Sequence, residues 1–270
     1  MKRVNFTTYI GLGLGLYFVI SGMIESGHIS LFWNFPSFLV IIGGTTGALI
    51  LSYPLEHLKT LGSVMVRAFT NQKIDLKKDI QNIVEVSVLA RKSGVLALEG
   101  VAKEYEDDAF FQKGIQMISD GFSREALTKN LKTEIFYMKK RHQIGIDMVD
   151  MIANSVTSLG LMGTYIGLIP MLNFLDNPSA LGPLMSLELV SSFYGCFLSY
   201  VIFTPLVRKL KAMSAAEVLR NTLIMDGLSE VLEGKNPKLI EELLSASLTK
   251  KQMRKMMREA DSEFNNERIA

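Results

Sequence analysis

Cysteine and histidine are scarce in this chain of 270 residues, which contains one cysteine and three histidines. Cys196 has no second cysteine in the chain with which to form a disulfide. The three histidines are scattered, so the sequence offers no His/Cys cluster with the spacing of a metal site. It also shows no glycine-rich phosphate loop and no Ser/His/Asp arrangement. These absences argue against an enzyme, and we expect neither a cofactor nor a bound metal.

Charge is almost absent from four long stretches. Each is long enough to cross a hydrocarbon core ~30 Å thick, which requires about 20 apolar residues as a helix. Of the 29 Lys and Arg residues, 2 precede the first stretch, 15 lie between residues 56 and 148, and 12 follow residue 207. The positive-inside bias therefore places both termini and the large middle segment in the cytoplasm. The stretches are residues 4–24, 31–55, 151–175 and 182–207.

These features predict an all-α integral membrane protein with four transmembrane helices and a helical cytoplasmic domain inserted between spans 2 and 3. We expect a first hairpin in residues 1–55, the cytoplasmic domain in 56–148, a second hairpin in 149–207, and cytoplasmic helices with a basic tail in 208–270. The net charge of +2 says little about nucleic acid, because the cations lie where the topology requires them, and we expect no nucleic-acid partner.

Helix signals in the cytoplasmic segments are strong. An apolar stripe predicts a helix over residues 73–92, which Gly94 ends. Ser123 is a suitable N-cap for one helix of about 50 residues that continues through the third span, with ~1.5 Å of rise per residue. Asn236 and Pro237 predict the start of a short helix. The basic tail, residues 250–258, either contacts anionic lipid or forms a solvated end.

Small and polar residues mark the third and fourth spans. Gly163 and Gly167 have the small-xxx-small spacing that allows close helix packing within one subunit or between subunits. Thr164 and Ser192 each lie about 10 residues from the outer end of their spans, so both fall near the bilayer midplane and are candidates to line an ion route. Glu188 lies four residues before Ser192 on the same helix face. A carboxyl in a span is costly and suggests function, although a protonated interface residue is the plain alternative.

Several sequence motifs stand out in the spans and in the cytoplasmic segment. They are Leu159-Gly-Leu-Met-Gly-Thr-Tyr-Ile-Gly-Leu168, the outer loop Leu175-Asp-Asn-Pro178, Leu181-Gly-Pro183, Ser191-Ser192-Phe-Tyr-Gly195, Thr204-Pro-Leu-Val-Arg-Lys-Leu210, Leu89-Ala-Arg-Lys-Ser-Gly-Val-Leu-Ala-Leu-Glu99, and Met117-Ile-Ser-Asp-Gly121. These motifs resemble those of the flagellar stator A subunit, the MotA/PomA family. The third-span core is similar to the family's Gly-Met-x-Gly-Thr-x-x-Gly-Leu, and the matches run in order from about Ser37 to Leu248.

The resemblance implies an ion-driven torque unit of the bacterial inner membrane. In that family, five A subunits surround two copies of a B subunit, which carries a membrane Asp and a peptidoglycan-binding domain. Transported H+ or Na+ passes that Asp and turns the A ring. By the same resemblance, Arg91 and Glu99 contact a rotor switch-complex protein; without the match they read as a solvated pair. The four spans here place no obvious ion-carrying carboxylate at midplane, so the site needs the partner chain.

The sequence departs from the family pattern at the coupling positions. Thr157 stands where the family usually has a proline, so Pro205 lacks its usual companion, which puts in doubt the usual coupling between ion passage and rotation. Pro170, late in the same span, is a candidate for a kink at another depth. Glu188 replaces a small apolar residue.

Other functions remain open from the sequence. One alternative is a rotary energiser of the ExbB/TolQ type, although proteins of that type have three spans. A second alternative is a stator repurposed for gliding or defence. A structural role without ion flow is another. The coupling ion is open too, because Thr164 and Ser192 resemble sodium-type members while proton-driven members can also carry this threonine.

Overall fold

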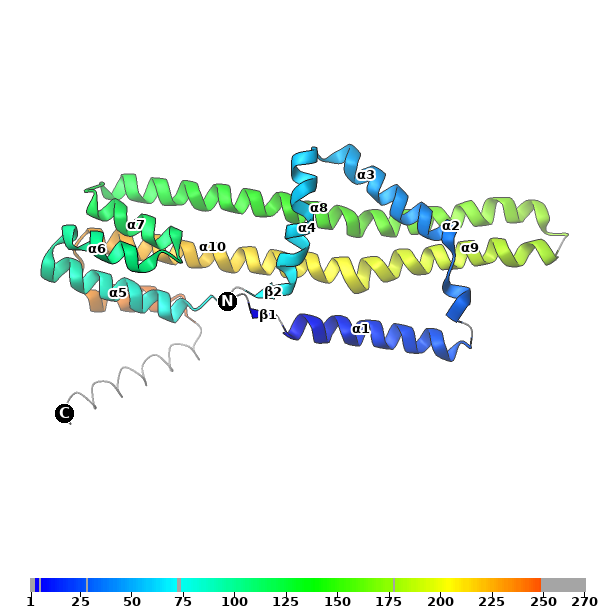
Figure 1. Ribbon diagram of the computed structural model, residues 1–270, viewed down its shortest axis with the longest axis horizontal. Coiled ribbons are helices and arrows are strands. Elements are labelled where there is room, and N and C mark those ends of the chain that lie inside the picture. The colour runs from blue at the N-terminus through cyan, green and yellow to red at the C-terminus, as the bar shows by residue number, and fades with distance from the viewer. Residues whose placement is uncertain (1–2, 5, 28, 72–73, 177, 249–270) are drawn as a thin grey trace. The chain divides into compact units, whose positions relative to one another are not determined.

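The computed structural model describes residues 3–4, 6–27, 29–71, 74–176 and 178–248, and these residues are overwhelmingly helical (Figure 1). The α-helices are α1 (Phe6–Glu25), α2 (Phe35–Phe38), α3 (Gly44–Ser52), α4 (Leu55–Phe69), α5 (Leu76–Ser93), α6 (Leu98–Ala102), α7 (Ala109–Ser119), α8 (Arg124–Met171), α9 (Pro178–Phe197), α10 (Thr204–Leu232) and α11 (Pro237–Ser245). Short 3-10 helices are η1 (Ile29–Phe32), η3 (Val95–Ala97), η4 (Lys103–Tyr105) and η5 (Leu172–Phe174). Two-residue strands β1 (Arg3–Val4) and β2 (Thr70–Asn71) pair antiparallel.

Packing divides the chain into two units. The span unit comprises Met1–Gln72 and Arg141–Met213, and the bundle unit comprises Lys73–Lys140 and Ser214–Ala270. Helices α8 and α10 each contribute residues to both units. Because these units follow packing and not membrane sidedness, the predicted boundaries at residues 55/56, 148/149 and 207/208 stay a prediction.

The span unit contains the apolar segments expected from the sequence. Among the described residues, four helical segments are long and apolar enough to cross a membrane. Their outer surfaces carry large apolar side chains, such as Phe18, Leu51 and Ile169, which are 69%, 89% and 64% exposed. In water such exposure costs free energy, whereas lipid or a partner helix covers these side chains. The predicted four-span, all-α membrane fold is confirmed.

Two of these segments include a π-helical turn that the sequence analysis did not predict. The turns are η2 (Leu39–Gly43) in the second span and η6 (Leu198–Phe203) in the fourth. Pro205 follows the second turn closely, and proline has no N–H to donate to the residue four positions earlier. The N–H of Thr204 donates to the carbonyl of Ser199, five residues earlier, which is the π-helical pairing.

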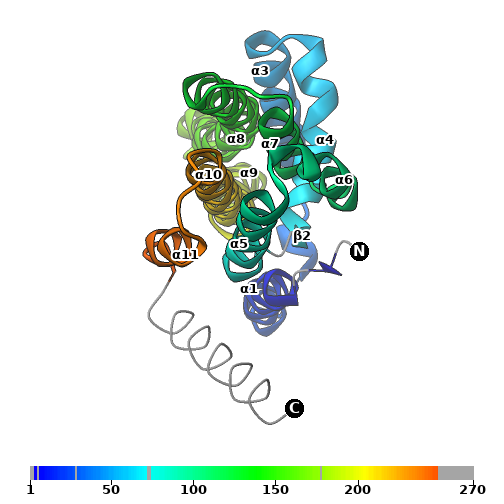
Figure 2. The same cartoon turned by 90° about the vertical axis from the view of Figure 1, so that its left-hand side faces the viewer.

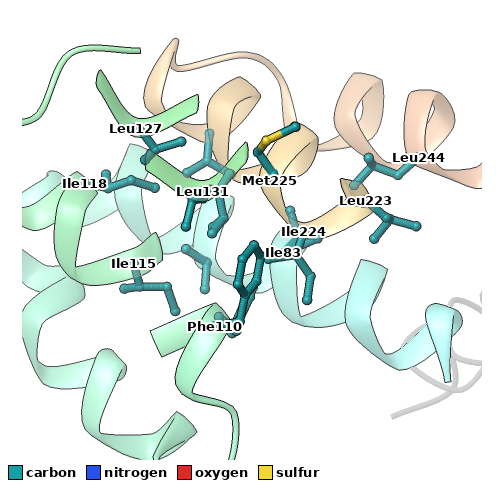
Figure 3. Packing of buried hydrophobic residues seen from close by; sticks show 14 of the residues in the cluster. Ile83, Phe110, Ile115, Ile118, Leu127, Leu131, Leu223, Ile224, Met225 and Leu244 are labelled. Atoms are coloured by element: carbon teal, nitrogen blue, oxygen red, sulfur yellow. The ribbon is translucent and has the colours of Figure 1, made fainter. Parts of the chain in front are cut away.

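The helices of the bundle unit are labelled in Figure 2. This unit has one apolar core, drawn from α5, α6, α7, α10, α11 and the start of α8 (Figure 3). Ile83, Ile115 and Leu131 are completely buried in it. Side-chain caps fix where two of its helices begin: Asp108 accepts from the N–H of Phe111 at 3.2 Å at the start of α7, and Asn236 caps α11. The helix predicted over residues 73–92 is α5, and Gly94 follows its last residue.

The long helix predicted from Ser123 through the third span is confirmed. Helix α8 contains 48 residues and begins at Arg124, where the hydroxyl of Ser123 accepts a hydrogen bond from the N–H of Ala126 at 3.2 Å. Gly121, with φ of +77°, makes the turn that separates α7 from α8. The basic tail that we expected to contact lipid or solvent lies outside the described residues.

Candidate functional site

Helices α8 and α9 pack along a seam of small residues. A Cβ atom placed on Gly160 would lie 2.8 Å from the Cα of Gly195, and one placed on Gly163 would lie 2.5 Å from the Oγ of Ser191. Further along α8, a Cβ on Gly167 would lie 2.8 Å from a backbone oxygen of α9. Only glycine allows the two backbones to approach this closely. The predicted close packing of Gly163 and Gly167 is therefore made within one chain.

The order of these contacts places Thr164 and Ser192 together. The contact residues ascend along α8 and descend along α9, so the two helices are antiparallel. Thr164 follows Gly163 and Ser192 follows Ser191, and one residue is a turn of about 100° about each helix axis. In an antiparallel pair of right-handed helices, these two turns lead to the same side. At ~1.5 Å of rise per residue, both hydroxyls also lie at nearly one depth.

Glu188 joins the same side of the α8–α9 pair. It lies four residues before Ser192 and therefore about one helical turn away, roughly 6 Å nearer the loop that links α8 to α9. Gly167 makes room for it, since a Cβ there would lie 3.0 Å from the backbone N and 3.2 Å from the Cβ of Glu188. Thr164, Glu188 and Ser192 are each partly buried. We call these three residues the polar side of the hairpin.

Span 2 packs on the opposite side of α9. The hydroxyl of Ser191 donates to that of Ser37 at 2.9 Å, and Ser37 in turn donates to the carbonyl of Leu187 at 3.2 Å. Both serines are buried. The hydroxyl of Tyr194 donates to the carbonyl of Phe32, before α2 begins. Leu187 and Tyr194 lie four residues before and three after Ser191, which turns them away from the polar side.

The polar side offers oxygen atoms to a cation. Thr164 Oγ1 donates to the carbonyl of Leu161 at 2.6 Å, so its one hydrogen is committed to the helix while its lone pairs remain acceptors. Ser192 supplies a second hydroxyl, and Glu188 supplies a carboxyl group. A passing Na+ or hydronium ion needs such oxygen ligands in place of water. The roles of Thr164, Ser192 and Glu188 in an ion pathway stay a prediction.

The three predicted coupling residues occupy different local structures. Thr157 lies within α8, which continues through it, and its hydroxyl donates to the carbonyl of Ala153 at 3.1 Å. Pro170 is the second-last residue of α8. Pro205 is the second residue of α10, directly after the π-helical turn η6. The π-helical turn thus accompanies Pro205 in span 4. Coupling roles for these residues stay predictions.

Arg91 and Glu99 lie on the bundle unit and are both exposed. Arg91 is in the last turn of α5, and Glu99 is in the first turn of α6. Gly94 reverses the chain between them with φ of +81° and ψ of 164°, a conformation that essentially only glycine adopts. Their exposure leaves both charges available to a partner, and the rotor contact stays a prediction.

The bundle unit contains an ion cluster that the sequence patterns did not predict. Arg220 of α10 donates to both carboxylate oxygens of Asp79, at 2.8 and 2.7 Å, and also to Asp108. Asp79 is in the first turn of α5 and is only 7% exposed, while Asp108 caps α7. Arg220 therefore holds the starts of two helices against α10. No local pattern reveals this, because 141 and 112 residues separate the partners.

A second ion cluster in the bundle unit joins the start of α8 to the end of α10. Arg124 donates to Glu230 at 2.9 Å and to Glu233, and Lys235 pairs with both glutamates. Most of these groups are partly exposed, so solvent screens the pairs. This cluster positions α8 and has no feature of a binding site.

Carboxylates also lie in α8 close to Tyr53, the residue that follows α3. Asp150 accepts from the side-chain amide of Asn154 at 3.2 Å, and Asp147 accepts from Gln143 at 2.6 Å.

The sequence and the fold both match known proteins. The family model for the MotA/TolQ/ExbB proton channel family matches residues 102–222, and that for the N-terminal part of motility protein A matches residues 9–94. Motility protein A of Cereibacter sphaeroides is 35% identical over 246 residues, covering 91% of this chain and 96% of its own. Chemotaxis protein PomA of Vibrio alginolyticus is 32% identical, covering 89% and 94% of the two chains.

Solved structures agree with this relationship. A chain of the flagellar MotAB stator complex from Bacillus subtilis matches with a TM-score of 0.84 and 33% identity, covering 91% of this chain and 97% of that one. The C. jejuni MotAB structure matches the fold with a TM-score of 0.83 at 24% identity. The relatives align along almost their full length, across both hairpins and the intervening helices. This chain belongs to the motility protein A (MotA/PomA) family.

Proposed function

We propose that this chain is the A subunit of a flagellar stator, a multi-pass inner-membrane protein that conducts ions together with a B subunit and uses their flow to turn a rotor. The polar side of the α8–α9 hairpin carries this proposal. It presents the hydroxyls of Thr164 and Ser192 and the carboxyl group of Glu188 on one side of the helix pair, while span 2 packs on the opposite side. A row of oxygen ligands is what an ion route requires.

The hairpin supplies only part of the ion route. Thr164 and Ser192 are neutral and accept a cation weakly, and the carboxyl group of Glu188 lies about one helical turn nearer the outer loop, so a full charge at the depth of the two hydroxyls must come from a partner. The solved relatives are MotAB complexes, and a B-subunit helix with a membrane Asp placed against the polar side supplies that charge. Five copies of this chain around two such helices present five equivalent polar sides. The ring then advances as the Asp moves from one side to the next.

Ion passage is coupled to rotation here in a different way from that in a stator whose third span is kinked by a proline. Thr157 continues the hydrogen bonds of α8 where a proline would interrupt them, because its N–H remains available as a donor and its hydroxyl bonds back to the helix. The adjustable element on our account is the π-helical turn before Pro205 in span 4. A π-helical turn changes its hydrogen-bond register at lower cost than a regular helix does, so it accommodates a passing partner charge.

The output surface is the exposed turn that carries Arg91 and Glu99. Their charges have opposite sign and reach solvent from a well-packed bundle, so they suit transient contacts with a charged rotor switch-complex protein. An ExbB/TolQ-type energiser is not favoured, because the N-terminal motility protein model and full-length motility relatives cover both hairpins. The distribution of cations supports a cytoplasmic location for both termini.

Expression of this chain with its B subunit in a flagellated strain that lacks both stator genes tests the proposal. Rotation of tethered cells should return and should stop when the coupling ion is removed. Varying external Na+ and pH separately identifies that ion. A matched strain expressing the B subunit alone is the control. Rotation that stays absent despite normal membrane levels of both proteins would overturn the proposed function.

A further inference from the structure

Leu96 is an apolar side chain left in solvent at the centre of the charged turn. It is 76% exposed, the highest value among the large apolar residues in the described part of the bundle unit. The next is Phe136, at 57%. Leu96 contributes little to the core, so its side chain is available for contact with another molecule.

The turn that presents Leu96 is firmly held. Gly94 provides the reversal, and its carbonyl accepts a hydrogen bond from the N–H of Ala97 at 3.2 Å. Two residues after Leu96, the side chain of Leu98 is completely buried in the bundle core, and Ala102 is 4% exposed. A side chain on such an anchored turn loses little conformational freedom on binding, which favours it as a contact residue.

Charges of opposite sign flank this side chain. Residues three apart lie on the same side of both 3-10 and α-helices, so Leu96 of η3 and Glu99, the second residue of α6, lie on one exposed side. Arg91 and Lys92 end α5 just before the turn, and both are exposed. The surface therefore combines an apolar centre with positive charge on one flank and negative charge on the other.

We propose that Leu96 is the apolar anchor of the rotor contact and inserts into an apolar socket on a rotor helix. An acidic group of the rotor faces Arg91, and a basic group faces Glu99. The proposal rests on the proposed function and adds the residue that prolongs the contact between the stator and the rotor. Exposed ion pairs alone are weak and are screened by salt. An apolar anchor that excludes water from their surroundings strengthens them, as at the centre of other protein interfaces.

The charge pattern favours a protein partner over lipid. An anionic membrane surface attracts Arg91 and Lys92 but repels Glu99, whereas a rotor helix with both signs satisfies all three. A second copy of this chain is distinguished by experiment, because loss of a subunit contact lowers assembly and ion conduction, while loss of a rotor contact leaves both intact.

Substituting Leu96→Asn, which has similar size but is polar, tests the anchor in the full stator complex. The readout is the stepwise speed of single motors, which reports the torque of each unit and the time for which it stays engaged. We expect engagement shortened by about tenfold, the factor that burial of one leucine supplies. Leu96→Met should retain most of the lifetime. Leu239→Asn, at an equally apolar position of α11 that is 50% exposed, is the matched control and should behave as wild type.

Each outcome decides the proposal. Engagement equal to wild type in Leu96→Asn overturns it, and so does an equal loss in Leu239→Asn. A fall in ion conduction or in assembly of Leu96→Asn also overturns it and points to a second copy as the occupant. The proposed function fails separately, if the wild-type complex gives no ion-dependent rotation or if single reversals of Arg91 and Glu99 both leave torque normal.

Discussion

A methyl group added at Gly163 should separate the two helices that carry the polar side. In Gly163→Ala, the new Cβ would lie 2.5 Å from both the Cβ and the Oγ of Ser191. Ser191 cannot yield freely, because it is buried and hydrogen-bonded to Ser37. Overpacking costs about 1–3 kcal/mol, and a lost buried hydrogen bond costs roughly 0.5–1.5 kcal/mol. We therefore expect a loss of about 2–4 kcal/mol in the free energy of unfolding.

The thermal midpoint of the solubilised complex measures this loss. A fall of about 5–15 °C corresponds to the expected free energy for a chain of this size. Gly62→Ala is the control, because a Cβ at Gly62 in α4 meets nothing within 4 Å; the change should be neutral or stabilise by up to about 1 kcal/mol.

A second substitution, at Ser191, tests whether the close approach of the two helices causes the loss of stability. Ser191→Ala keeps the Cβ that clashes and should not rescue Gly163→Ala, whereas Ser191→Gly removes the clash and should recover much of the loss. A Gly163→Ala variant as stable as Gly62→Ala would refute the seam. Rescue by Ser191→Ala to the same extent as by Ser191→Gly would show that the hydroxyl, and not the close approach, is the constraint.

Three further predictions follow from the clusters and the polar side. Arg220→Met should lower the free energy of unfolding of the bundle unit by about 3–5 kcal/mol, since it leaves Asp79 buried and unpaired. The midpoint of unfolding measures this loss. Lys113→Met, which breaks an exposed ion pair, is the control and should cost under about 1 kcal/mol. Glu188→Gln should lower ion flux at limiting external ion more than at saturating ion, because it weakens entry. Ser192→Ala should reduce flux at all concentrations or alter ion preference. Flux against external Na+ and pH separates the last two, and an unchanged profile in Glu188→Gln would leave that residue as a tolerated interface carboxyl.

The sequence predicted what depends on local signals. The length of α8 could be predicted because Ser123 caps it and no strong stop signal intervenes before the outer end of the span. The four spans followed from charge-free length alone. Close packing at Gly163 and Gly167 was also expected, although the sequence could not tell whether the partner helix lies in the same chain.

Features that depend on distant residues were not predicted. The Ser37–Ser191 bond joins residues 154 apart, and no pattern in either span reveals the other. The clamp of Arg220 on Asp79 and Asp108 has the same cause. The π-helical turn before Pro205 was missed because periodicity assumes a regular helix, whereas this turn has a different hydrogen-bond register. The shared side of Thr164 and Ser192 required the antiparallel contact order as well as their depth.

Disulfide crosslinking tests directly whether a partner helix passes the polar side of the hairpin. In a Cys196→Ser background, the chain has no other cysteine, so Ser192→Cys can be paired with a cysteine scanned along the membrane helix of the B subunit. Met162→Cys is the matched control, because Met162 is 53% exposed and lies two residues before Thr164, about 200° around α8 from the polar side. We expect crosslinks from Ser192→Cys near the partner's membrane Asp and none from Met162→Cys. Crosslinks from Met162→Cys alone would contradict this placement of the partner helix.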